Sequence, residues 1–143
     1  MRIEELANYG MPSEVIKILK NSGLEELYPP QEEAVLHGLL GLENSFVVSV
    51  PTASGKTLIA EFLMLKAISQ GLGKCLYIVP LRALASEKLE EFKKYEKLGI
   101  KAAISTGDYD TSDAWLANYD IIVTTSEKAD SLLRHRSEWL DRI

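Results

Sequence analysis

Hydrophobic positions along the chain fall into short apolar runs that alternate with stretches of helical spacing. Each run is too short for a helix and rich in Val, Ile, Phe or Tyr, which predicts strands. The predicted strands are residues 45–50, 74–79, 101–105 and 120–124. The predicted amphipathic helices between and after them are 56–70, 81–98, 111–117 and 126 to about 139. This alternation predicts an α/β fold in which crossover helices connect a mostly parallel sheet.

Two further helical patterns precede the first apolar run. One begins at Pro12 and ends in the turn-rich residues 21–23. The other runs from Gln31 to about Leu40, after two prolines that suit a helix start, and Gly41 is its expected stop. No repeat, low-complexity tract or linker divides the sequence, so we expect one domain with one core.

Composition supports this expectation and adds a few limits. The chain has 143 residues, of which 46% are hydrophobic and 26% charged, as in an ordinary soluble globular domain. No run approaches the roughly 18 apolar residues of a membrane span, and residues 1–14 carry acids where a secretory signal carries an apolar core. We therefore expect a cytoplasmic protein. The net charge of -5 gives no global attraction to nucleic acid, although phosphate contacts need only a local group of donors.

Isolated residues that could carry chemistry have simpler explanations. Cys75 is the single cysteine and lies inside an apolar run, so we expect a buried strand residue and no disulfide. His37 and His135 are far apart and lack the spacing of a metal site, which favours surface or packing roles. Trp115 and Trp139 lie on predicted amphipathic helices and are expected to pack rather than to stack on bases.

Residues 50–57, VPTASGKT, have the features of a phosphate-binding loop. A strand is predicted before them and a helix directly after, so the helix N-terminus would face a bound anion. Val50 replaces the usual first glycine, which removes a flexible hinge but no ligand, because the donors are backbone N–H groups. We expect the nucleotide to contact the loop residues Val50, Pro51, Thr52, Ala53, Ser54, Gly55, Lys56 and Thr57.

Three loop residues have distinct expected roles. Gly55 would let the backbone approach the phosphates, and Lys56 would place its ammonium near the β and γ phosphates. The Thr57 hydroxyl would ligate Mg²⁺. The expected ligands are therefore ATP and Mg²⁺, with Lys56 and Thr57 as the residues closest to phosphoryl transfer. A simple helix cap beside a solvated lysine is the alternative, and the predicted strand and helix favour the nucleotide.

The loop resembles motif I of superfamily 2 helicases, in which A-P-T-G-S-G-K-T is frequent, although Ala53 departs from the frequent glycine. Upstream, LYPPQEEAV resembles the Q motif, whose glutamine recognises adenine through paired hydrogen bonds. This resemblance assigns adenine recognition to Gln31, whose carboxamide offers both donors and an acceptor.

Three downstream segments extend the resemblance. VPLRALASEK at 79–88 resembles motif Ia, STGDYD at 105–110 resembles motif Ib, and DIIVTTSEKADSLLRHR at 120–136 resembles the next nucleic-acid-contacting element. In the family these segments hold the backbone of one nucleic-acid strand, and ligands of open α/β sheets collect beyond the carboxyl ends of strands. The resemblance assigns these contacts to Arg82, Ser105, Thr106, Gly107 and Thr125.

Within superfamily 2, residues 107–140 are similar to the archaeal Holliday-junction-migration helicases. These belong to the Ski-two-like group and are related to the helicase part of DNA polymerase theta. The resemblance implies a RecA-like P-loop domain of three α/β/α layers, with a helical Q-motif region at 1–43 and the sheet region at 44–143. It also implies ATP-driven 3′-to-5′ movement on single-stranded DNA at forked or stalled replication structures.

In that family the next strand carries a D-E-x-H motif, which holds Mg²⁺ through water and activates the attacking water. The sequence contains no D-E-x-H. We expect a fold truncated before this Walker B strand, no useful ATP hydrolysis by the chain itself, and exposed sheet edges and apolar faces. Two alternatives stay open: a Ski-two-like RNA helicase, and a self-contained nucleotide-binding module without motor function.

Overall fold

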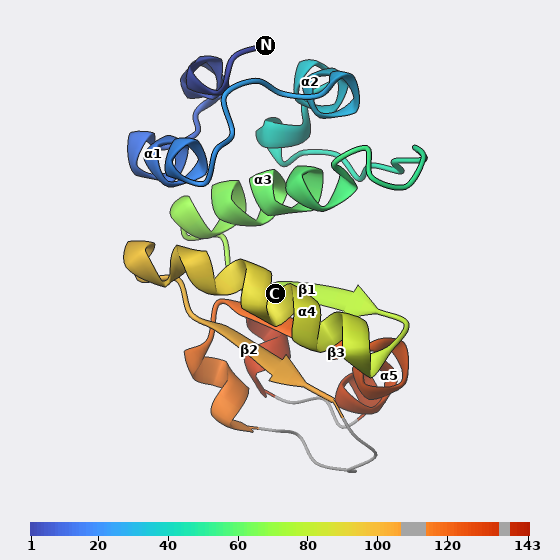
Figure 1. The fold of residues 1–143 in the computed structure, drawn as a ribbon. Coiled ribbons are helices and arrows are strands. Elements are labelled where there is room, and N and C mark those ends of the chain that lie inside the picture. Colours follow the sequence, from blue (N-terminus) through green and yellow to red (C-terminus); the bar gives the residue numbers. More distant parts are fainter. Residues whose placement is uncertain (107–113, 135–137) are drawn as a thin grey trace. The chain divides into compact units, whose positions relative to one another are not determined.

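The structure is a computed structural model that describes residues 1–106, 114–134 and 138–143. The described residues form two compact units, Met1–Gln70 and Gly71–Ile143 (Figure 1). The expected subdivision near residue 43 remains a prediction. Among the residues that the structure describes, no helix is long and apolar enough to span a membrane.

The N-terminal unit consists of helices around an apolar core (Figure 1). Its core side chains include Leu6, Leu19, Val35 and Phe62, all almost completely buried. Burial of these side chains is the main source of stability for helices this short. The elements are η1 Ile3–Tyr9, α1 Ser13–Asn21, α2 Pro29–Leu36, η2 Leu39–Gly41 and α3 Lys56–Ser69.

The structure confirms the first two predicted helices and shortens the second. α1 buries Val15, Ile16 and Leu19, as its apolar spacing predicts. α2 ends at Leu36 rather than near residue 40, because Gly38 takes a left-handed conformation with φ 93° that turns the chain into η2. The 3-10 helix η1 has no counterpart among the predicted elements.

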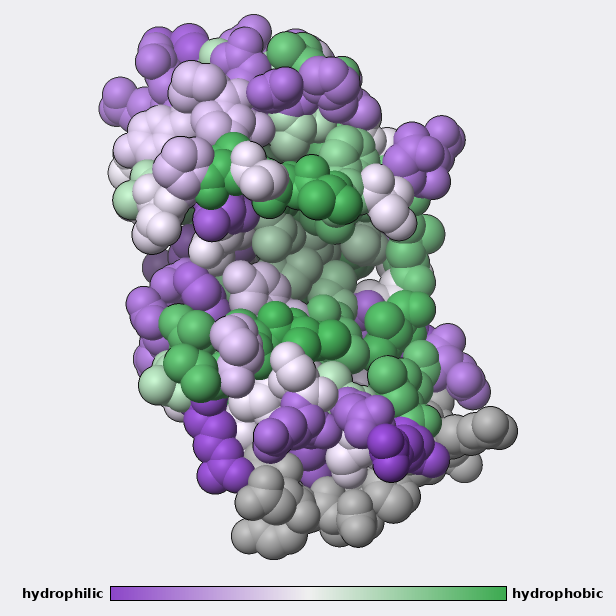
Figure 2. Space-filling view, turned by 90° about the vertical axis from the view of Figure 1, so that its right-hand side faces the viewer, coloured by the Kyte–Doolittle hydropathy of each residue, from purple (hydrophilic) through white to green (hydrophobic). Residues whose placement is uncertain are grey.

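The prediction of a strand at 45–50 is wrong. These residues form no strand in the structure, and Val47 is 98% exposed. An apolar run becomes a strand only where a neighbouring strand satisfies its backbone groups, and no strand in the described part of the chain pairs with it. Hydrophobic residues consequently lie open on the surface of this unit (Figure 2). Its exposed large apolar side chains are Tyr9, Tyr28, Leu36, Val47 and Val48.

The C-terminal unit contains a parallel sheet of three described strands, β1 Cys75–Val79, β2 Ala102–Ser105 and β3 Ile121–Thr125. Their order is β1-β3-β2, so β3 is central, and all five of its residues are buried. Ile121 pairs with Cys75 on one side and with Ala102 on the other. The other three predicted strands and the parallel sheet are therefore confirmed.

Helices cover both faces of this sheet. On one face α4, Arg82–Phe92, packs against the strands, with the rings of Phe92 and Tyr77 edge to face at 5.1 Å (Figure 1). Tyr77 pairs with Val123, so the adjacent Ile122 points to the opposite face. There it packs in a cluster with residues of η4 Ala114–Asn118, α5 Ser126–Arg134 and η5 Glu138–Arg142. The unit thus has the three α/β/α layers that the sequence predicts.

Several helix boundaries differ from the prediction. The helix expected at 81–98 divides into α4 and the 3-10 helix η3, Lys93–Leu98. Residues 107–113 and 135–137 lie outside the described residues. They include the start of the helix expected at 111–117, part of the helix expected at 126–139, and the residues Gly107 and His135. Trp139 is buried in the cluster, as expected. Trp115 is 50% exposed, and its ring packs edge to face with the ring of Tyr119.

Cys75 begins β1 and is partly buried rather than fully buried as expected, and this partial burial raises the pKa of its thiol from 9.0 to about 11. Because the thiolate is the nucleophile, we expect the folded chain at pH 9 to react with iodoacetamide at least tenfold more slowly than the urea-unfolded chain, a rough lower bound. Alkylation followed by mass spectrometry measures both rates, and equal rates would show that the site is open.

The same shift predicts a pH dependence of stability. The pKa is higher in the folded state, so the unfolded state loses its proton first, and the free energy of unfolding should fall as pH rises from about 9 toward 11. The Cys75→Ala variant should lose this component of the pH dependence.

Candidate nucleotide-binding site

The predicted phosphate loop leads directly into α3. Gly55 is the N-cap of this helix and takes a left-handed conformation with φ 80°. Lys56, the first helical residue, is exposed, and Thr57 is partly buried. The first N–H groups of a helix lack partners within it and carry partial positive charge, so the loop and helix together suit an anion. The helix of the prediction is confirmed, although the strand before the loop is not.

Gln31 of α2 lies against this loop. Its side chain is 2% exposed, its Oε1 accepts a hydrogen bond from the Tyr28 N–H at 2.8 Å, and its Nε2 donates to the Gly55 carbonyl at 3.2 Å. A Cβ atom on Gly55 would lie 2.1 Å from Gln31 Nε2. Glycine is therefore favoured at position 55, because the left-handed conformation strains an L side chain and an added Cβ would displace the end of the Gln31 side chain. The structure brings together the two segments that the sequence connects with a nucleotide.

Ala53 is one of two non-glycine residues with positive φ in the described chain, at 65°. An L side chain in this region costs about 1–2 kcal/mol. The glycine that is frequent at this place in motif I would avoid that cost. Alanine at position 53 therefore introduces backbone strain into the loop.

We expect the Ala53→Gly variant to be more stable by about 0.5–1 kcal/mol, because relief of the left-handed strain exceeds the added freedom of the unfolded chain. Thermal unfolding should show a midpoint about 3 °C higher. An unchanged or lower midpoint would mean that this conformation is not strained.

The predicted nucleic-acid contacts lie in the C-terminal unit at the carboxyl ends of its strands. Parallel strands end on the same edge, and the arrowheads of β1 and β2 point the same way in Figure 1. Arg82 is exposed at the start of α4, and Thr106 is partly exposed after β2. Ser105 and Thr125 are buried; the Ser105 carbonyl accepts from the Thr124 hydroxyl at 2.6 Å. Arg82 is thus the most accessible of the described candidates.

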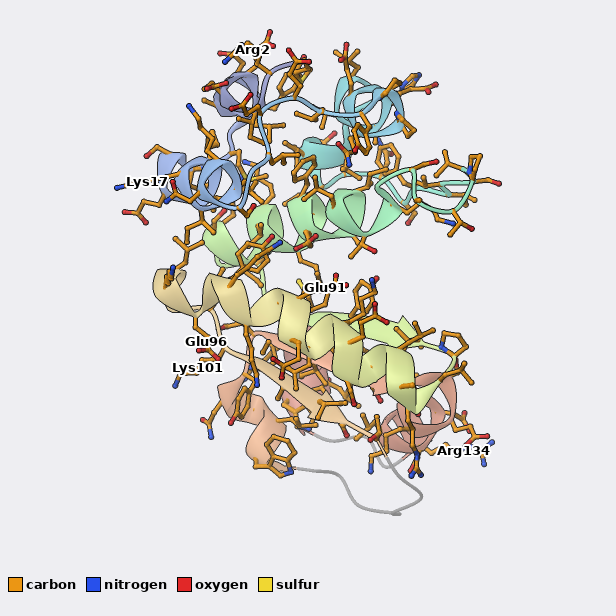
Figure 3. All side chains as sticks on the ribbon, in the orientation of Figure 1. Arg2, Lys17, Glu91, Glu96, Lys101 and Arg134 are labelled. Atoms are coloured by element: carbon orange, nitrogen blue, oxygen red, sulfur yellow. The ribbon has the colours of Figure 1, made fainter. Side chains whose placement is uncertain are left out.

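A buried lysine that is not among the predicted site residues lies beside this edge. Lys128 lies in the first turn of α5 and is 2% exposed. Its N–H donates to Thr125 Oγ1 at 3.4 Å, which caps the helix. Leu132, one turn later, is also buried, so the i, i+4 spacing could have placed Lys128 on the inner face. By contrast Arg134 points away from the unit and pairs with Asp130 at 3.0 Å (Figure 3).

Comparison of the sequence with models of protein families shows to which family the chain belongs. The model of the DEAD/DEAH box helicases matches residues 28–143, which begin just before Gln31 and include the whole loop. The chain belongs to the DEAD/DEAH box helicase family. The resemblance to superfamily 2 helicases is thereby confirmed.

Proteins similar to this family member include Hel308 helicases of two organisms. The chain is 50% identical over 143 residues to the ATP-dependent DNA helicase Hel308 of Pyrococcus horikoshii, covering 100% of the chain and 19% of that protein. It is 51% identical over 141 residues to Hel308 of Thermococcus kodakarensis, covering 98% of the chain and 12% of that protein. These matches confirm the expected similarity to archaeal Ski-two-like helicases. The chain spans about one fifth or less of the length of these relatives.

Solved structures of a helicase share the fold of this family member. The DUF1998 helicase MrfA bound to DNA aligns with a TM-score of 0.77 and 27% identity over 91% of the chain and 19% of MrfA. MrfA bound to DNA and AMPPNP aligns with a TM-score of 0.76, with the same identity and coverage. Both agree with a RecA-like α/β fold.

Proposed function

We propose that this chain binds ATP with Mg²⁺ and is the N-terminal ATP-binding part of an ATP-dependent DNA helicase. The hydrogen bond between Gln31 and Gly55 carries this proposal, because it joins the glutamine that resembles the Q-motif residue to the predicted phosphate loop at the start of α3. Family membership and the Hel308 relatives support it.

The loop residues suit the expected ligands. Backbone N–H groups of 52–57 and the N-terminus of α3 would bind phosphate oxygens, and the exposed Lys56 would bind the terminal phosphates. Thr57 would offer one hydroxyl ligand to Mg²⁺, which neutralises phosphate charge when bound. Gln31 would recognise adenine with the donor and acceptor capacity that its two hydrogen bonds leave.

The strand ends of the C-terminal unit are the proposed nucleic-acid side of the protein. Arg82 would bind a backbone phosphate directly. Ser105 and Thr125 are buried and would mainly fix the conformation of the strand ends beside it. By family resemblance the longer helicase would move 3′ to 5′ on single-stranded DNA at forked or stalled structures. Competition between labelled single-stranded DNA and RNA for binding to the proposed full-length helicase tests which nucleic acid it prefers. Preference for RNA would overturn the DNA assignment.

The chain itself should bind ATP without turning it over. Its 143 residues contain no D-E-x-H, and phosphoryl transfer needs groups that position and activate the attacking water. The coding sequence beyond Ile143 gives the most economical test of the helicase assignment. A D-E-x-H motif within about the next dozen codons supports it, and its absence there would overturn it.

A further inference from the structure

The outer edge of β2 pairs with no strand in the part of the chain that the structure describes. The order β1-β3-β2 places β2 beside β3 alone. Adjacent residues of a strand direct their N–H and C=O groups to opposite sides, and the Lys101 carbonyl accepts the Ile121 N–H of β3 at 3.0 Å. Ala102 and Ile104 therefore direct their backbone groups away from β3, to an edge that can pair with a further strand.

A hollow lies at the amino end of this edge. Its volume is about 340 Å³, and it is lined by Glu96, Gly99, Ile100, Lys101, Ala102 and Tyr119. The ring of Trp115, which is 50% exposed, packs on the Tyr119 ring with 5.5 Å between the ring centroids, so a second aromatic side chain lies next to the hollow. A hollow of this size can accept a large apolar side chain together with the backbone that carries it.

Two side chains of opposite charge line the hollow. Glu96 and Lys101 are exposed and project from the same side of the unit (Figure 3). Among the residues that the structure describes, neither side chain forms an ion pair. A polyanion would be repelled by Glu96 and a polycation by Lys101, whereas a peptide that carries one base and one acid matches both charges.

We propose that the outer edge of β2 and this hollow bind an extended peptide segment of a partner protein by strand addition. The segment pairs with the backbone of Ala102 and Ile104 and inserts one apolar side chain into the hollow. It carries a base that contacts Glu96 and an acid that contacts Lys101. In this mode main-chain hydrogen bonds provide affinity, and the side-chain pocket provides specificity.

This surface goes beyond the proposed nucleotide function. It belongs to the C-terminal unit, whereas the phosphate loop belongs to the N-terminal unit. The hollow lies at the amino end of β2, and the candidate nucleic-acid residues lie at the carboxyl ends of the strands. The peptide and the nucleic acid therefore bind at different ends of the sheet.

The test uses the synthetic peptide acetyl-STVTVLKES-amide as the probe. It supplies a β-forming run, a leucine for the hollow, and one base and one acid. We expect it to bind the 143-residue chain saturably with a dissociation constant below about 1 mM in a calorimetric titration. The same peptide with N-methyl groups on every backbone amide of its TVTVL run lacks the donors for strand pairing and should not bind.

Hydrogen exchange followed by NMR gives a readout for single residues. Saturating peptide should slow exchange of the Ala102 and Ile104 N–H groups at least roughly tenfold more than that of Ala103, whose N–H already faces β3. Equal slowing at all three residues, or at none, would contradict strand addition.

A proline on the outer edge tests the pairing without removing the ladder to β3. Ala102→Pro removes an N–H that faces away from β3, so the sheet should remain and peptide binding should fall at least roughly tenfold. Ile104→Pro makes the same change at the second outward position, and it replaces the first variant if circular dichroism shows Ala102→Pro to be unfolded. Peptide binding that a folded proline variant leaves unchanged would overturn the proposal.

Charge variants test the chemistry of the partner. Lys101→Gln should weaken peptide binding roughly threefold, because an exposed ion pair contributes little. Lys97→Gln is the matched control, since Lys97 is exposed and does not line the hollow, and it should bind the peptide like the parent chain. Absence of saturable peptide binding would overturn the proposal and leave the nucleotide assignment untouched, because ATP binding is measured independently on the same chain.

Discussion

Lys56→Ala should weaken binding of ATP with Mg²⁺ to the chain roughly 30-fold, which corresponds to about 2 kcal/mol. Lys56 is the exposed first residue of α3, where its ammonium can reach anions that the helix N-terminus also attracts. The loss should be similar for ATP and tripolyphosphate, because the lysine interacts with phosphates and not with the base.

Lys17→Ala is the matched control for this variant. Lys17 lies exposed on α1 of the same unit and points away from it (Figure 3). Its replacement removes the same charge from the unit without touching the loop, so ATP binding should stay within twofold of the parent value, a rough margin for long-range screening. Equal affinities of Lys56→Ala and Lys17→Ala would refute the role given to Lys56.

Gly55→Ala should disrupt both the loop and its contact with α2. The left-handed conformation costs an alanine about 1–2 kcal/mol, and the added Cβ would displace the Gln31 carboxamide from its two hydrogen bonds, each contributing about 1 kcal/mol. We expect a total loss of about 3 kcal/mol and a thermal midpoint roughly 10 °C lower. ATP binding should fall at least tenfold, roughly, because the N-cap moves with the loop.

Gly38→Ala isolates the conformational part of this effect. Gly38 has a similar φ of 93°, and nothing lies within 4 Å of the position of its Cβ. Its alanine variant should lose only about 1–2 kcal/mol and keep the parent affinity for ATP. If the two variants were equally stable and bound ATP equally well, the contact between Gln31 and Gly55 would have no energetic weight.

The sheet of the C-terminal unit could be predicted from sequence because local pattern and tertiary environment agree there. β1 and β3 are both rich in β-branched or aromatic residues, and β3 is completely buried, so local propensity and burial indicate the same structure there. Residues 45–50 have the same local pattern and form no strand. Strand formation depends on a partner elsewhere in the chain, and a local pattern cannot show whether that partner is present.

The local structure of the candidate site could be predicted from the sequence, but its contacts could not. The sequence of 50–57 specifies a turn followed by a helix, and both are present. It could not show that Gln31 donates to the Gly55 carbonyl, because that contact depends on how α2 packs against α3.

The decisive measurement for residues 50–57 is a calorimetric titration of ATP with Mg²⁺ into the folded chain. We expect saturable binding of one nucleotide per chain, retained by Lys17→Ala and weakened by Lys56→Ala, and no release of phosphate over the course of the titration. A chain that circular dichroism shows to be folded, but that gives no saturable binding, would contradict the assignment of residues 50–57 as its nucleotide site.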